Sequence, residues 1–236
     1  MLYSNEIHEL NRFITSCMII HEEVWPMNGF ERRKERKKLN ILTAALNLFT
    51  EFGVQKVSIQ EIAQKAQVSQ VTIYNYFGGK DQLLFETVNK FIYDRFDKFK
   101  DVVHDNDMNF KDKISFVIRD KKESVLHLNP GFLKTVIADQ PELQELVQNF
   151  TMNDAVPLLM ELIDQGKEEG YVHPDISFRS IMFYIEMYYQ AMRSTPDFFE
   201  HSLADQSEEI TQMFFYGLMG KPEERLHKED GDGTKH

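Results

Sequence analysis

Apolar side chains recur along this chain at the spacing of helices. Between positions 39 and 52 they return every three or four residues, which is the period of one face of an α-helix. The same spacing predicts further helices over 58–66, 70–77, 81–103, 110–128, 132–139, 154–168, 177–193 and 207–219. Strand-like alternation is hard to find, and glycine and proline are scarce. The pattern therefore predicts an all-α protein.

The segment 58–80 reads as two short helices joined by a turn. Ser58 and Glu61 match a capping box, in which the hydroxyl accepts the Glu61 amide and the carboxylate accepts the Ser58 amide. The residues from Gln67 to Ser69 form the turn, and Ser69 is placed to cap a second helix that begins at Gln70. This layout predicts a helix-turn-helix.

The second short helix carries the side chains that we expect to read DNA. Val71, Tyr74 and Phe77 are expected to pack inward. The residues expected to face outward are Gln70, Thr72, Ile73, Asn75 and Tyr76. In the major groove, side-chain amides can form hydrogen bonds with the edge of adenine, and hydroxyl groups can donate or accept hydrogen bonds. Methyl groups and aromatic edges can contact the thymine methyl.

Charge is divided unevenly along the chain. The total is −11, but residues 29–80 hold nine basic and four acidic side chains, a net charge of +5 that leaves −16 elsewhere. The basic arm Phe30–Lys38, with Arg33 and Lys37, is expected to bind phosphates and to reach beside or into the minor groove. The alternative is a solvated start of a helix. The acidic remainder keeps DNA off the other faces and disfavours a membrane role.

The succession S-x-x-E-I-A-x-x-A-x-V-S-x-x-T-I-Y-N-Y-F-x-x-K-x-x-L-L, from Ser58 to Leu84, resembles the signature of the tetracycline-repressor (TetR/AcrR) family. The resemblance extends back through Phe49 and Gly53. It implies a three-helix helix-turn-helix DNA-binding domain over 29–80 and a larger helical domain over 81–219 for effector binding and dimerisation. Gln67 stands where the family most often has glycine, which predicts a left-handed backbone or a slightly different turn.

The resemblance also implies roles for particular residues. Tyr74 and Lys80 would clamp phosphates, and Ser58 would cap its helix and touch the backbone of the duplex. The full candidate DNA-binding set is Arg33, Lys37, Ser58, Ser69, Gln70, Thr72, Tyr74, Asn75, Tyr76 and Lys80. The function implied is a cytoplasmic repressor that binds a palindromic operator in double-stranded DNA as a homodimer, through the helices at 177–193 and 207–219. The alternative is a DNA-bound interaction protein of the same fold without a small-molecule switch.

A small hydrophobic effector is the partner that the resemblance implies for the second domain. The candidate residues are His127, Met160, Phe183, Tyr184 and Met187. The alternative is that these methionine and aromatic side chains are plain core.

Other chemistry finds no support in the sequence. Gly78-Gly79-Lys80 lacks the spaced glycine and the following Ser or Thr of a phosphate-binding loop. The eight histidines lack the spacing of a metal site. We therefore expect no enzyme activity, no metal and no cofactor. Cys17 is the single cysteine, so no intrachain disulfide forms and a reducing cytosol is the natural setting.

The two ends of the chain lie outside the predicted domains. Residues 1–28 are an N-terminal extension, and Met1–Pro26 is either an accessory helix or an upstream extension of a reading frame that starts at Met27. Residues 220–236 are charged and are predicted to be a disordered tail. No apolar run approaches the ~20 residues of a membrane helix.

Overall fold

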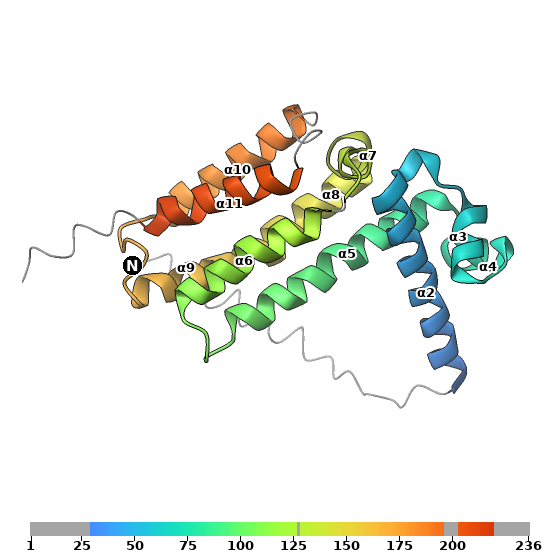
Figure 1. The fold of residues 1–236 in the computed structure, drawn as a ribbon, viewed down its shortest axis with the longest axis horizontal. Helices are drawn as coiled ribbons and strands as arrows, with labels where there is room; N and C mark the ends of the chain where they lie inside the picture. Colours follow the sequence, from blue (N-terminus) through green and yellow to red (C-terminus); the bar gives the residue numbers. More distant parts are fainter. Residues whose placement is uncertain (1–28, 127, 196–202, 220–236) are drawn as a thin grey trace, which may run out of the picture. The chain divides into compact units, whose positions relative to one another are not determined.

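The computed structural model describes residues 29–126, 128–195 and 203–219, and this part of the chain contains helices and no strand (Figure 1). The all-α prediction is confirmed. The α-helices are α2 (Gly29–Phe52), α3 (Ile59–Ala66), α4 (Gln70–Phe77), α5 (Lys80–Val103), α6 (Phe110–Val125), α7 (Pro130–Lys134), α8 (Pro141–Phe150), α9 (Val156–Glu168), α10 (Phe178–Ser194) and α11 (Leu203–Met219). Three short stretches join them, the 3₁₀ turn η1 (Val54–Lys56) and the π-helices η2 (Thr135–Asp139) and η3 (Thr151–Ala155).

The basic stretch Phe30–Lys38 differs from its prediction as an arm. It forms the first turns of α2, and binding of phosphates by this helical stretch stays a prediction. The cause is local, because the stretch is rich in Glu, Arg and Lys, which are good helix formers, and contains no proline or glycine after Gly29. The chain divides into two compact units, residues 1–39 and 40–236.

A first cluster of buried apolar side chains lies within the unit 40–236 and holds the helix-turn-helix together. Phe49 of α2, Ile62 of α3 and Ile73 of α4 are all fully buried in it. Phe132 and Leu143, from beyond α6, are buried in the same cluster. The core of the helix-turn-helix is therefore continuous with part of the helical domain that follows it.

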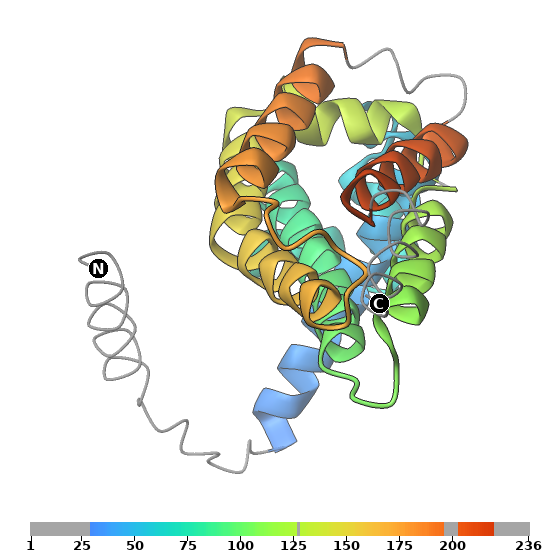
Figure 2. The ribbon, with the colours of Figure 1, turned by 90° about the vertical axis from the view of Figure 1, so that its left-hand side faces the viewer.

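A second cluster lies among the long helices, where α5, α6 and α9 contact one another and are seen nearly end-on in Figure 2. Its buried members include Val103, Phe110, Leu162 and Ile181. Helix α5 supplies Leu83 and Leu84 to the first cluster and Val103 to the second. It thus links the two cores. No helix in the described ranges has the length and apolar character needed to cross a bilayer.

One residue, Asn129, joins the end of α2 to the start of α7. Its backbone N–H donates to the Thr50 carbonyl at 2.7 Å, and its side-chain nitrogen donates to the Glu51 carbonyl at 3.3 Å. Its Oδ1 accepts the Gly131 amide at 2.9 Å and caps α7. Asn129 therefore satisfies carbonyls that the end of α2 leaves without helical partners.

Gly53 follows α2 in a backbone conformation that favours glycine, with φ of +82°. A Cβ at this position would lie 3.0 Å from Asn129 Oδ1. We predict that Gly53→Ala lowers the free energy of unfolding by about 1–3 kcal/mol, because the strained backbone and the crowded amide both oppose a side chain. Urea denaturation measures the change.

Gly79→Ala is the matched control for this substitution. Gly79 has an extended backbone, with φ of 178°, and no atom within 4 Å of an added Cβ. The control is expected to change the unfolding free energy by less than about 0.5 kcal/mol. An equal loss of unfolding free energy in the two variants would contradict the role assigned to Gly53.

Candidate nucleic-acid interface

The start of α3 is fixed by the capping box that the sequence predicts. The Ser58 amide and hydroxyl each donate to Glu61 Oε2 at 2.7 Å, and Ser58 Oγ accepts the Glu61 amide at 3.2 Å. The hydrogen bond from the Ser58 backbone is the largest cause of a lowered pKa of the Glu61 carboxyl. The carboxylate therefore stays charged at neutral pH and holds the first turn of α3.

The turn between α3 and α4 depends on a left-handed residue. Gln67 has φ of 54° and ψ of 45°, which confirms the left-handed alternative predicted for it. Its conformation lets the Val68 amide donate to the Ala63 carbonyl at 3.0 Å. Asn40 Nδ2 donates to the Ala66 carbonyl at 2.8 Å and ties α2 to the end of α3. Hydrogen bonds therefore hold the turn both to α3 and to α2.

Helix α4 faces the core with different residues from those predicted. Ile73 is fully buried and Phe77 is 4% exposed, whereas Val71 is 65% and Tyr74 50% exposed. The prediction that Val71 and Tyr74 pack inward and Ile73 faces outward is wrong. Ile73 and Phe77 are four residues apart and share one helix face, so the pair Ile73–Phe77 was the signal that could have set the orientation.

The exposed face of α4 carries Gln70, Val71, Tyr74 and Asn75. Each of these positions lies three or four residues from another of them, so together they form one continuous surface. Val71 was missed as a candidate, and its methyl groups suit contact with a thymine methyl. Tyr76 is only partly exposed, because it packs against the first cluster.

Two hydroxyls at the start of α4 are already paired. Ser69 Oγ lies 2.9 Å from Thr72 Oγ1 and accepts the Thr72 amide at 3.1 Å, so Ser69 caps the helix as predicted. Both hydroxyls keep a second hydrogen-bonding position. Ser69 and Thr72 thus lie at the end of α4 where its free amides are, a place suited to a phosphate.

Lys80 has a structural contact that the sequence did not reveal. Its Nζ donates to the Val54 carbonyl at 2.7 Å, and the residue is half-buried. This bond ties η1 to the first turn of α5. An ammonium group has three donors, so the contact leaves others for a phosphate.

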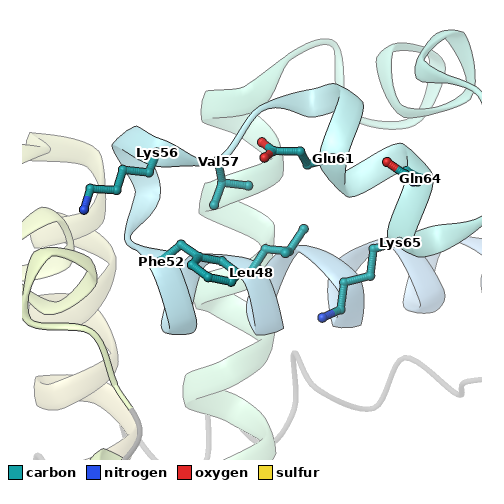
Figure 3. Close-up of a pocket in the computed structure, with 7 residues that line it drawn as sticks. All are labelled: Leu48, Phe52, Lys56, Val57, Glu61, Gln64 and Lys65. Atoms are coloured by element: carbon teal, nitrogen blue, oxygen red, sulfur yellow. The ribbon is translucent and has the colours of Figure 1, made fainter.

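Further basic residues lie on the surface of α2 and α3. Arg33 and Lys37 are exposed and four residues apart, so they share one face of α2. A groove of about 450 Å³ lies between α2, η1 and α3, with an apolar floor that includes Leu48 and Phe52 (Figure 3). Lys56 and Lys65 lie at its two ends. Lys56 and Lys65 therefore add positive charge to the helix-turn-helix beyond the predicted candidates.

The family model described as "Bacterial regulatory proteins, tetR family" matches residues 41–87. The match spans α3, α4 and the parts of α2 and α5 that hold them. This part of the chain is a TetR-family DNA-binding domain. The protein is accordingly a DNA-binding transcriptional regulator.

Known relatives agree with the TetR assignment. The repressor KstR2 of Mycobacterium tuberculosis is 22% identical over 162 residues, which cover 66% of this chain and 75% of that protein. The regulator HbdR of Aromatoleum sp. is 44% identical over 54 residues, 23% of this chain and 24% of that protein. FadR from Bacillus subtilis, solved in complex with stearoyl-CoA, has the same fold with a TM-score of 0.55, 16% identity and coverage of 76% of this chain and 98% of that one.

The predicted effector residues of this TetR-family chain lie in different surroundings. Met160 packs against the second cluster, and the Tyr184 ring lies 5.1 Å from that of Phe214. Phe183 and Met187 are 72% and 51% exposed on α10. His127 lies outside the described residues. None of the four described residues lines the groove of Figure 3 or the second groove described below, and the role of all five in effector binding stays a prediction.

The orientation of α4 can be tested by a pair of truncations. We predict that Ile73→Ala lowers the unfolding free energy by about 2–4 kcal/mol, because it leaves a cavity in the first cluster. Val71→Ala is expected to cost less than about 0.5 kcal/mol, because its side chain faces solvent. Chemical denaturation of both variants measures the difference, and the reverse order of stabilities would refute the observed orientation.

Proposed function

We propose that this TetR-family regulator is a cytoplasmic repressor that binds a palindromic operator as a homodimer and leaves it when a small effector binds. The exposed face of α4 is the observation that carries the proposal. Gln70 and Asn75 offer amides there, and Val71 offers methyl groups, the groups that read base edges in the major groove. Buried Ile73 and Phe77 fix that face on the opposite side of the helix.

Phosphate contacts would position this face on the duplex. Lys80 at the start of α5 and the hydroxyl groups of Ser58, Ser69 and Tyr74 are suited to the backbone next to α4. Arg33 and Lys37 add two charges on α2. Such contacts give affinity without sequence preference, whereas the amides of α4 give the preference.

The dimer is proposed on the surface of the last two helices. Phe183 and Met187 of α10 and Met213 and Tyr216 of α11 are each more than half exposed. The two helices meet through Tyr184 and Phe214, so their exposed apolar residues can form one surface. Exposed apolar patches mark interaction sites. Two copies joined there would present two reading helices to the halves of a palindrome.

Release by an effector is supported by the kinds of relatives found. KstR2 is a repressor, and FadR of the same fold was solved with stearoyl-CoA. An effector acts only through a difference in affinity between the DNA-bound and free states. Helix α5 would couple the effector site to the DNA-binding helices, because it packs in both buried clusters.

Selection of bound fragments from genomic DNA tests the proposal as a whole. The purified protein is expected to enrich fragments with an inverted repeat, and a footprint should protect two half-sites. Adding hydrophobic compounds to the footprint then tests release. A footprint that no compound displaces would favour an interaction protein without a switch. Enrichment without any shared sequence would overturn the proposal.

The proposed phosphate role of Lys80 predicts a change in salt dependence. Lys80→Ala is expected to weaken binding to all duplexes and to make the slope of log affinity against log salt shallower by about 1, since one counterion fewer is released. Titration by fluorescence anisotropy at several salt concentrations measures the slope. Lys90→Ala is the control, because Lys90 pairs with Asp94 farther along α5. An unchanged slope in Lys80→Ala would rule out the phosphate contact.

The proposed dimer surface predicts the effect of added charge. Phe183→Glu combined with Met213→Glu is expected to yield a monomer, because two charges would be buried without partners. Sedimentation velocity measures the mass. Val71→Glu introduces the same side chain at another exposed apolar position, which is 65% exposed on α4, and should leave the dimer intact. A dimer that persists in the double variant would place the interface elsewhere.

A further inference from the structure

A second groove, of about 390 Å³, lies along α5, α8 and the π-helix η3. Phe85 and Tyr93 of α5 and Phe150 of α8 give it aromatic walls. Its carboxylates are Glu142, Glu145 and Asp154. Its size lies within the range of small-molecule sites. Its lining includes none of Met160, Phe183, Tyr184 and Met187, the described residues that the resemblance suggested for an effector.

The aromatic walls are held by ring packing. The Tyr93 and Phe150 rings lie 5.3 Å apart at 74°, and the Phe96 and Phe150 rings lie 5.5 Å apart at 89°. These edge-to-face contacts fix the orientation of the rings that border the groove. A ring face attracts a cation, most strongly where water is partly excluded. Tyr93 remains 37% exposed, so a ligand can reach it.

The charge of the groove has one sign. Glu142, Glu145 and Asp154 are acidic, and none of the described residues that line the groove is basic. Asp154 Oδ2 accepts the Tyr93 hydroxyl at 2.9 Å, a neutral donor that leaves the carboxylate charge in place. This hydrogen bond is also the largest cause of a raised pKa of the Tyr93 hydroxyl, so the phenol stays protonated at neutral pH.

The groove adjoins an irregular stretch of helix. The π-helix η3 begins directly after Phe150 and supplies Asn153 and Asp154 to the lining. Single π-helical turns are uncommon and occur often at functional sites. The combination of this turn with aromatic walls and uniform negative charge is what distinguishes the groove from an ordinary surface hollow.

We propose that this groove binds an organic cation with an apolar body. The cationic group would lie between the glutamates and the ring faces, and the apolar part would cover Phe85 and Leu146. An anion would be repelled by the three carboxylates. A neutral ligand would remove water from the carboxylates without offering them an opposite charge. A bare metal ion does not fit, because no three metal-binding side chains converge anywhere in the described residues.

The position of the groove also suits regulation. Phe85 and Leu146 pack against the first cluster, which holds the buried residues of α4. A ligand that moves α8 relative to α5 would therefore disturb the core behind the reading helix. Binding of the cation is independent of the proposed function, whereas its action as the effector rests on that function.

Isothermal titration of the full-length protein with tetraphenylphosphonium and tetraphenylborate tests the charge preference. The two ions have the same shape and opposite charge. We expect the cation to bind with one site per chain and at least about 10-fold more tightly than the anion, a difference of about 1.4 kcal/mol. Equal affinities would overturn the proposal, as would the absence of cation binding.

Variants locate the site. Glu142→Gln with Glu145→Gln is expected to weaken cation binding by about 10-fold, and Tyr93→Leu by about 5-fold, through loss of charge pairing and of a ring face. The matched control, Glu123→Gln with Glu209→Gln, removes the same charge from exposed positions on α6 and α11. Thermal melts confirm that each variant is folded. Equal affinity in the two double variants would place the cation elsewhere and overturn the proposal.

A second measurement separates this site from the proposed function. The cation is added to the protein bound to its selected DNA fragment. If the cation releases DNA from the wild-type protein but not from the Glu142→Gln/Glu145→Gln variant, the result supports the groove as an effector site. Cation binding without release overturns the effector role and leaves the binding site standing. Failure to select any DNA would overturn the proposed function, while the titration still decides the binding site.

Discussion

The burial of Ile73 and Phe77 in the first cluster is the constraint on which this regulator depends. Complete burial of an isoleucine contributes about 1.5–3 kcal/mol, so rotating α4 about its axis would be costly. With that face fixed, Gln70 and Asn75 can point only outward. The same cluster includes Phe132 from the helical domain, so the reading helix rests on a core that the rest of the protein helps to build.

Local signals in the sequence predicted much of this arrangement. The capping box of Ser58 and Glu61 was found because its two hydrogen bonds join residues three apart. The left-handed backbone of Gln67 was one of two alternatives predicted from its place in a turn where glycine is usual, and the structure selects it. The all-α class and the approximate bounds of the helices followed from apolar spacing, which is also a local property.

Contacts between distant residues could not be predicted in the same way. Nothing near Asn129 in the sequence indicates that it binds the end of α2, and Tyr93 and Asp154 are 61 residues apart. The face of α4 was misjudged for a related reason. On a helix of two turns several apolar combinations are possible, and packing against the other helices selects the pair Ile73 and Phe77. The groove between α5 and α8 likewise depends on tertiary packing.

The ratio of specific to non-specific DNA affinity tests the central claim, that the outward face of α4 reads sequence. The ratio should be measured at one salt concentration with the selected operator and an unrelated duplex. We expect a ratio of at least about 10³ for the wild type. Gln70→Ala with Asn75→Ala should reduce it by about 10-fold or more while leaving non-specific affinity unchanged. An unchanged ratio in the double variant would contradict the account.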